Sequence, residues 1–189
     1  ALLESKKYYL SELDESRLWI GECFKFEKEV VNNDFSYPAR KYISILNDYI
    51  PKSSSVLDLG CGKGRYLEYF NDKFKNIEFY GIDPVFKGDK IKNGDAYNIN
   101  LDKKFDLVFI DADKSNYCNY FNLVIGKMKK GGIILSDNVL WSGKVVEKLD
   151  KKDIDTKALL EYNSLLNSDP RVETVLLPIR DGLSISRVV

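Results

Sequence analysis

Two stretches of the chain run through consecutive apolar residues and end in acidic or amide side chains. In FDLVFIDADKSNY, the run from Leu107 to Ile110 leads into Asp111, and in GGIILSDNVLW a similar run leads into Asp137 and Asn138. Unbroken apolar runs of this length are typical of strands covered on both faces, as in a parallel sheet. Because ligands bind beyond the carboxyl ends of parallel strands, we expect these three polar side chains to share one rim of the sheet.

Three oxygen-bearing side chains at one rim favour a Mg²⁺ or Ca²⁺ site over a zinc site. The alternative interpretation is structural, since Asp or Asn after a strand often caps the next helix. Two such strand ends, with Lys114 beside the first, favour the ligand-binding interpretation.

Between these stretches and around them, strands and helices alternate. Short strands are predicted at 56–59, 78–83 and from 90, helices at 65–70, 115–128 and 156–168, and a final pair of strands at 172–179 and 183–189. The turn Arg180-Asp181-Gly182 between the last two strands indicates a hairpin. The apolar spacing in 115–128 predicts an amphipathic helix that Ser115 caps and Gly131-Gly132 ends.

These elements predict an α/β fold, mostly parallel with a C-terminal antiparallel hairpin. We expect a single domain over 1–189, in which 1–50 form N-terminal helices and 51–189 the catalytic core. Only about six residues separate Asp83 from Lys90, whereas a parallel crossover usually needs a dozen or more. The helix between the second and third strands is therefore predicted to be shortened or missing.

Composition excludes several classes of function. Lys+Arg and Asp+Glu both number 29, so net charge gives no general attraction to nucleic acid or anionic membranes. Histidine is absent, which excludes Ser-His-Asp and Cys-His catalysis and leaves Asp, Glu, Lys, Tyr or Cys as the general base. Three cysteines without a CxxC pair, no membrane-length apolar run and no signal peptide predict a cytoplasmic protein.

The segment Gly60-Cys61-Gly62-Lys63-Gly64 lies between a predicted strand and a predicted helix, where glycines allow positive φ and close approach of a ligand. The dinucleotide fingerprint would need glycine at position 65, which is Arg65, so an NAD-dependent oxidoreductase is disfavoured. With Asp58 ahead of the loop, the pattern resembles motif I of the class I S-adenosylmethionine methyltransferases. The resemblance implies that Gly60, Gly62 and Gly64 lie against the methionine end of the cofactor and Asp58 near its amino group.

Two further acids extend this candidate cofactor site. Asp83 ends the second predicted strand, where an acid commonly binds ribose hydroxyls, although it could also be a turn acid before Pro84. Gly94-Asp95-Ala96 resembles the methyltransferase adenine-contact motif, which implies that Asp95 reaches the exocyclic amine.

FDLVFIDADKSNY, GGIILSDNVLWSGKV and EYNSLLNSDPRVETVLLPIRDGLSISRVV resemble the metal-dependent O-methyltransferases, the group of catechol and caffeoyl-coenzyme A O-methyltransferases and their bacterial relatives. The resemblance implies a Rossmann-like, seven-strand class I methyltransferase sheet. By position it makes Asp111, Asp137 and Asn138 ligands of Mg²⁺, Ca²⁺ or Mn²⁺, with Asp111 also at the cofactor. It makes Lys114 the general base and places Trp141 beside the acceptor ring. Arg180 stands where these relatives usually have glycine.

The function implied is methyl transfer from S-adenosylmethionine to a vicinal-diol, catechol-like phenolic acceptor with a divalent metal. Two alternatives remain open: a tRNA 5-hydroxyuridine O-methyltransferase, which clustered lysines at 144, 148, 151 and 152 would support, and a non-catalytic S-adenosylmethionine-binding module. By analogy with relatives we expect a homodimer that does not bind membranes.

Overall fold

A computed structural model describes residues 55–64, 67, 74, 77–85, 91–93, 103–178 and 180–189 of the chain. The predicted N-terminal helices of 1–50 and the predicted adenine contact Asp95 lie outside these residues.

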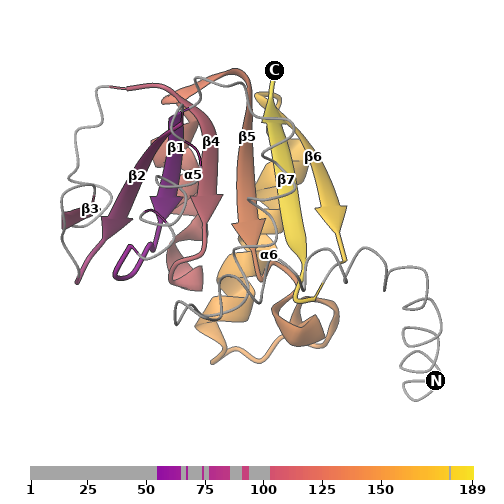
Figure 1. The fold of residues 1–189 in the computed structure, drawn as a ribbon. Helices are drawn as coiled ribbons and strands as arrows, with labels where there is room; N and C mark the ends of the chain where they lie inside the picture. The colour runs from indigo at the N-terminus through magenta and orange to yellow at the C-terminus, as the bar shows by residue number, and fades with distance from the viewer. Residues whose placement is uncertain are drawn as a thin grey trace, which may run out of the picture. The chain divides into compact units, whose positions relative to one another are not determined.

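The described residues form a seven-stranded sheet in the order β3-β2-β1-β4-β5-β7-β6 (Figure 1). The strands are β1 (Ser55–Leu59), β2 (Glu78–Asp83), β3 (Ile91–Asn93), β4 (Phe105–Ile110), β5 (Met128–Asp137), β6 (Val172–Leu177) and β7 (Leu183–Val188). The pairs from β3 through β5 are parallel, while β7 pairs antiparallel with both β5 and β6. The predicted fold, a mostly parallel sheet with an antiparallel hairpin at its end, is confirmed.

The connection between β2 and β3 is short. β2 ends at Asp83, β3 begins at Ile91, and the two strands pair in parallel. This length is well below that of an ordinary helical crossover. It agrees with the predicted shortening, although residues 86–90 lie outside the described part of the chain.

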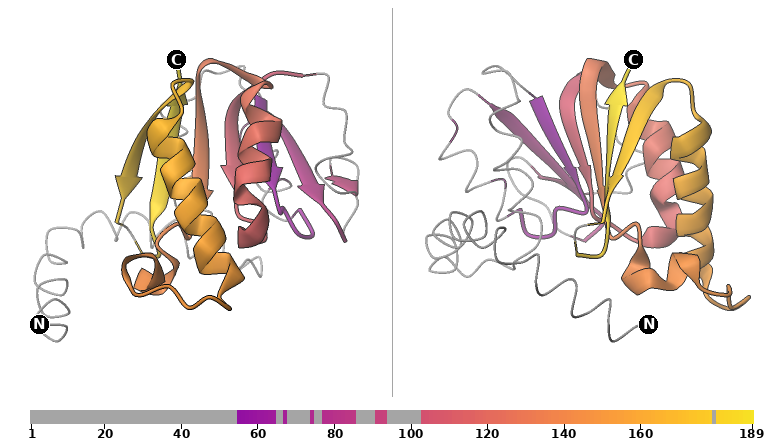
Figure 2. Two further views of the ribbon diagram at one scale, coloured as in Figure 1. Left: turned by 180° about the vertical axis from the view of Figure 1, so that it is seen from behind. Right: turned by 90° about the vertical axis from the view of Figure 1, so that its right-hand side faces the viewer.

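In the part of the chain that the structure describes, two α-helices cover one face of the sheet, as the edge-on view in Figure 2 shows. They are α5 (Tyr117–Ile125), which follows the 3-10 turn η2 (Lys114–Asn116), and α6 (Ile154–Ser168), which follows the 3-10 segment η3 (Trp141–Val146). In α6 the buried positions recur every three or four residues, so one stripe faces the sheet, at Thr156, Leu159, Tyr162 and Leu166. Within the described residues, none of the helices is both long enough and apolar enough to cross a bilayer.

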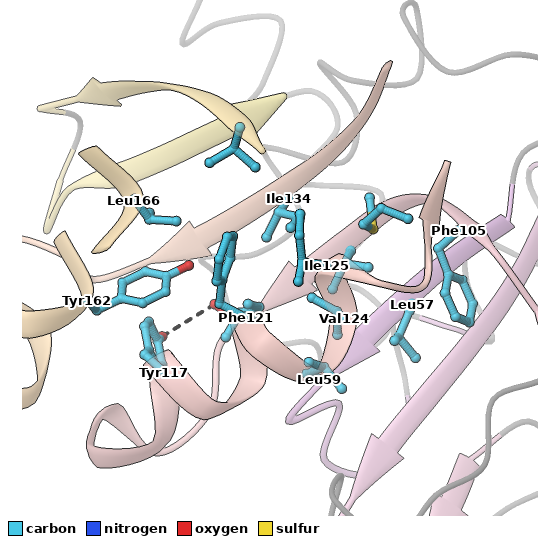
Figure 3. Close-up of a cluster of buried hydrophobic side chains, with 14 of the residues drawn as sticks. Leu57, Leu59, Phe105, Tyr117, Phe121, Val124, Ile125, Ile134, Tyr162 and Leu166 are labelled. Carbon is cyan, nitrogen blue, oxygen red and sulfur yellow. Dashed lines mark hydrogen bonds between the residues drawn. The ribbon is translucent and has the colours of Figure 1, made fainter. Parts of the chain in front are cut away.

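The aromatic core joins these two helices. Tyr162 of α6 packs edge-to-face on Tyr117 and Phe121 of α5, with ring centroids 5.3 and 6.4 Å away (Figure 3). Each fully buried aromatic ring contributes about 1.5–3 kcal/mol through apolar burial. The contact holds α5 and α6 side by side on this face of the sheet, α5 against β4 and α6 against β6.

The predicted helix over 115–128 is wrong at both ends. Ser115 does not cap it, because η2 precedes α5 and the Ser115 hydroxyl donates to Asp113 instead. At the other end α5 stops at Ile125, and Met128, which continues the helical spacing, begins β5 and pairs with Phe105. Gly126 weakens the helix at this point, and the Phe105 amide donates to the Lys127 carbonyl at 2.7 Å. Strand pairing across the sheet therefore overrides the local period.

The glycine loop after β1 packs directly against the residue that follows β4. Gly60 has φ of 85°, and a Cβ atom there would lie 2.4 Å from the carbonyl oxygen of Asp111. The Asp111 amide in turn donates to the carbonyl of Leu59 at 3.2 Å. Only glycine allows this approach, which places the loop beside Asp111.

We expect Gly60→Ala to destabilise the protein more than Gly62→Ala. Both positions have positive φ, which costs an L-residue about 1–2 kcal/mol, but a Cβ at Gly62 meets no atom within 4 Å. Only the first variant also forces a backbone shift. Urea unfolding of both variants measures the difference, and equal losses would contradict the importance of the Gly60–Asp111 approach.

A second prediction concerns Asp153, the N-cap of α6, which accepts a hydrogen bond from the Thr156 amide at 3.0 Å and pairs with Lys144 at 3.0 Å. The hydrogen bond from the Thr156 amide, and then the contacts with Lys144, lower the pKa of the Asp153 carboxyl from 3.8 to about 2. Because its folded-state pKa is depressed, the charge stabilises the fold above the unfolded pKa, and this contribution is lost as pH falls toward about 2.

Asp153→Asn keeps a capping acceptor but no charge, so its unfolding midpoint should fall below that of the wild type at neutral pH and approach it on acidification. Asp153→Ala should remain below both throughout, because it also lacks the cap. Thermal unfolding followed by circular dichroism over this pH range tests both statements. If the difference in unfolding midpoint between wild type and Asp153→Asn widened on acidification, the stabilising effect assigned to the Asp153 charge would be contradicted.

Candidate active site

The carboxyl ends of four parallel strands meet at one rim of the sheet, where the arrowheads of β1, β2, β4 and β5 in Figure 1 point the same way. Each brings one predicted acid. Asp58 lies in β1, Asp83 ends β2, Asp111 follows β4, and Asp137 ends β5. The four acids predicted from strand ends are thus gathered at a common edge.

Asp83 organises the glycine loop. Its Oδ2 accepts a hydrogen bond from the Gly62 amide at 2.9 Å, and its Oδ1 accepts one from the Val85 amide at 2.8 Å. Gly60, Gly62 and Gly64 all have positive φ, as a loop that turns its backbone toward a ligand requires. Each carboxylate oxygen has a second lone pair, so contact with ribose hydroxyls remains a prediction that these bonds do not exclude.

Asp58 is buried beside this loop, with only 5% of its surface exposed. Burial, and then the negative charges of Asp111 and Asp83, raise the pKa of its carboxyl from 3.8 to about 7. A cationic group bound among these carboxyl groups would favour the ionised form of Asp58. This end of the site is therefore suited to a positively charged ligand.

Lys114 lies in η2 and is only 7% exposed. Its Nζ donates to Asp111 Oδ1 at 3.1 Å and to the hydroxyl of Tyr117 at 2.6 Å. The same nitrogen lies 5.9 Å from the ring centroid of the half-buried Trp141. The structure therefore brings together Asp111, Lys114 and Trp141, to which the resemblance assigned a metal ligand, the general base and the side chain beside the acceptor ring.

Asp137 is 1% exposed, and its two oxygens differ. Oδ1 accepts a hydrogen bond from the Asn138 amide at 2.8 Å, whereas the buried Oδ2 has no partner among the described residues. Burial raises the pKa of the carboxyl, opposed chiefly by the Asn138 bond; Asp111 adds to the rise, while Arg180 and Lys114 lower it. A buried acceptor without a partner is costly, and a bound cation would satisfy it.

The donor set fits a hard divalent cation. Asp111 and Asp137 supply carboxylate oxygens, and the charge of Asp111 is close enough to raise the pKa of Asp137. Asn138 follows directly in the sequence with an amide oxygen. Mg²⁺ and Ca²⁺ prefer such oxygens. In the part of the chain that the structure describes, no group of three or more His, Cys, Asp or Glu side chains could hold a metal, so the third protein donor would be the amide. Asn138 has φ of 58°, which asparagine tolerates better than most residues.

Sequence reasoning missed three features of this rim. Tyr117, an apolar position of the amphipathic helix predicted over 115–128, has a hydroxyl that accepts a hydrogen bond from Lys114. Arg180, at φ of 55°, lies near enough to lower the pKa of Asp137. The hairpin turn supports the segment after β5, since the amides of Val139 and Leu140 donate to the carbonyls of Gly182 and Asp181. The turn was recognised as a hairpin, but its position depends on the pairing of β5 with β7, which has no local signal.

Backbone conformation also marks the segment after β5. Trp141 and Ser142 have φ of 49° and 55°, in the left-handed region. Such residues cost about 1–3 kcal/mol each and concentrate at functional sites. The rim thus combines a glycine loop in acidic surroundings, a set of hard oxygen donors, and a buried amine beside an aromatic ring. Such an arrangement can bind a positively charged ligand and a chelating aromatic acceptor.

Comparison with known proteins agrees with this chemistry. A family model described as O-methyltransferase matches residues 76–189, more than half of the chain. Tapetum-specific methyltransferase 1 of Arabidopsis thaliana is 36% identical over 115 residues, covering 59% of this chain and 47% of that protein. Caffeoyl-CoA O-methyltransferase 1 of Eucalyptus globulus is 43% identical over 88 residues, covering 44% and 36%.

The chain thus spans less than half the length of these two relatives. Among solved structures, the SAH-bound methyltransferase PaMTH1 of Podospora anserina superposes with a TM-score of 0.66 at 24% identity, covering 83% of this chain and 81% of that one. This likeness shows the shared fold. The match over the whole segment from β2 to the C-terminus shows that the chain belongs to the O-methyltransferase family.

Proposed function

We propose that this chain carries the active site of an S-adenosylmethionine-dependent, divalent-metal-dependent O-methyltransferase that acts on a vicinal diol of a small phenolic molecule. The observation that carries the proposal is the buried Oδ2 of Asp137, which has no hydrogen-bond partner among the described residues. The charge of Asp111, which Lys114 contacts, raises the pKa of the same carboxyl. Support for the cofactor comes from the family match and from PaMTH1, which was solved with SAH.

When bound, S-adenosylmethionine would supply a transferable methyl group, and a divalent cation would polarise the acceptor oxygens. At the cofactor end, the loop from Gly60 to Gly64 would bind the methionine portion against its backbone. Asp58 would pair with the amino group. Asp83 would bind the ribose hydroxyls while it keeps its hydrogen bond from the Gly62 amide of the loop. The acidic surroundings of the loop favour a cationic cofactor over its neutral product.

At the acceptor end, Asp111, Asp137 and Asn138 would hold the cation and so orient both diol oxygens. Trp141 would flank the acceptor ring, and Lys114 would receive the proton of the reacting hydroxyl at Nζ. These residues would hold the acceptor oxygen in line with the methyl group that S-adenosylmethionine would supply. Holding these atoms in line is the main contribution of the protein.

The segment from Lys144 to Asp155 favours a small acceptor over RNA. Its lysines at 144, 148, 151 and 152 are matched by acids at 147, 150, 153 and 155, and Lys144 pairs with Asp153. The segment therefore has no net positive charge to attract a phosphate backbone. tRNA and the expected homodimer remain predictions.

The direct test is methyl transfer from S-adenosylmethionine to a panel of catechols, with Mg²⁺ and with EDTA. We expect turnover that EDTA abolishes and that Asp111→Ala reduces by at least about 100-fold, because it removes a cation donor. Asp106→Asn is the matched control, since that carboxylate lies in β4, the strand that Asp111 follows, but accepts hydrogen bonds from the Ser55 amide and Lys129.

Three outcomes would count against the proposal. Turnover that survives EDTA would contradict the metal, and equal losses in Asp106→Asn and Asp111→Ala would contradict the assigned role of Asp111. Cofactor binding measured by calorimetry, without turnover of any diol, would favour a non-catalytic module. Methylation of tRNA that carries 5-hydroxyuridine would instead favour an RNA acceptor.

A further inference from the structure

Tyr117 places a buried hydroxyl at the centre of the candidate active site. The residue begins α5 and is fully buried, with its ring against Tyr162 (Figure 3). Its Oη lies 2.6 Å from Lys114 Nζ, 2.9 Å from the carbonyl oxygen of Asp137 and 3.3 Å from that of Ile110. The hydroxyl therefore connects the buried amine with the ends of the two strands that carry Asp111 and Asp137.

The direction of these hydrogen bonds follows from the available protons. A phenol has one proton to donate, and both carbonyl oxygens can only accept. The Tyr117 hydroxyl therefore donates its hydrogen bond to a carbonyl oxygen, and that of Asp137 is at the shorter distance. The Tyr117 oxygen is then left as an acceptor, and Lys114 must be the donor to it. The result is a directed chain from Lys114 through Tyr117 to the backbone of β5.

This series of hydrogen bonds determines where the remaining tetrahedral position of the Lys114 nitrogen can point. Asp111 and Tyr117 take two of its tetrahedral positions, and no other hydrogen bond to Nζ is present among the described residues. The Asp111 side chain is 36% exposed and is shared with the proposed cation site. Tyr117 is enclosed and anchored to main-chain atoms, so it is the firmer of the two supports.

We propose that Tyr117 is a positioning residue that holds the Lys114 amine toward the acceptor hydroxyl by joining it to the main chain of β5. The inference rests on the proposed function, because it assigns Tyr117 an effect on methyl transfer through Lys114. The proposed cation ligands do not by themselves position Lys114. The Tyr117 hydroxyl does so by joining the Lys114 amine and the strand that carries Asp137 in one hydrogen-bonded unit.

The chain offers a matched control in Tyr162. Tyr162 is equally buried, packs edge-to-face on Tyr117 with centroids 5.3 Å apart, and bonds the hydroxyl of Ser136 rather than Lys114. Tyr117→Phe and Tyr162→Phe each remove one buried hydroxyl from the same aromatic pair. A purely structural role for Tyr117 would give the two variants similar kinetics.

The experiment combines steady-state kinetics with NMR of lysine side chains. We expect Tyr117→Phe to lower kcat about 10- to 100-fold with little change in the acceptor KM, since misplacement of a reacting group costs this much. Tyr162→Phe should retain kcat. In a Lys114→Met background, Tyr117→Phe should cause no further loss, because Tyr117 acts through Lys114.

The second readout does not depend on turnover. In ¹⁵N spectra of the lysine ammonium groups, the Lys114 signal, assigned by its absence in Lys114→Met, should report a restrained group in wild type and Tyr162→Phe. In Tyr117→Phe it should report a mobile one. A Lys114 group that stays restrained without the Tyr117 hydroxyl would overturn the inference, as would additive losses in the double variant or an unchanged kcat.

Failure of the proposed function has a different signature. If wild type methylates no diol and no tRNA, the catalytic role of Tyr117 falls with the proposed function, whatever the NMR shows. If wild type is active and only the Tyr117→Phe results disagree, the inference alone is overturned.

Discussion

The pairing of β4 with β1 on one side and β5 on the other is the constraint on which the candidate active site depends. Ile110 pairs with Leu59 and with Ser136, so these three residues form one row across the sheet. The residues that follow them are Gly60, Asp111 and Asp137. A shift of one residue in either register would turn every side chain of the shifted strand to the opposite face and separate these groups. The fully buried, apolar end of β4 opposes such a shift.

The site concentrates polar groups in surroundings that otherwise exclude water. Asp58, Asp83, Lys114 and Asp137 are all buried at the rim. Asp83 and Lys114 are compensated by hydrogen bonds to the glycine loop, Asp111 and Tyr117. Asp58 has a raised pKa, and Oδ2 of Asp137 has no hydrogen-bond partner in the described part of the chain. A bound cation would relieve the unfavourable burial of both groups. The protein thus holds its acids in place before any ligand is bound.

The C-terminal hairpin of β6 and β7 supports the site from the β5 side, away from the glycine loop after β1. Its turn at 180–182 bonds the backbone of Val139 and Leu140, next to the left-handed residues Trp141 and Ser142. Gly182 allows close packing there, since a Cβ atom would lie 2.4 Å from the Leu140 side chain. The antiparallel end of the sheet therefore holds the segment that carries Trp141, and Arg180 brings a positive charge toward Asp137.

The amino-acid sequence by itself determined the strand ends and the chemistry attached to them. Asp58, Asp83, Asp111 and Asp137 each lie at or next to the carboxyl end of a strand, and the glycine spacing distinguished the loop from a dinucleotide fingerprint, because these are local properties of short segments. Tertiary structure alone decided that Met128 begins a strand, that Tyr117 contacts Lys114, and that the turn at Arg180 lies beside Asp137. Each of these depends on pairing or packing between segments far apart in the chain, where strand hydrogen bonds and burial outweigh local periodicity.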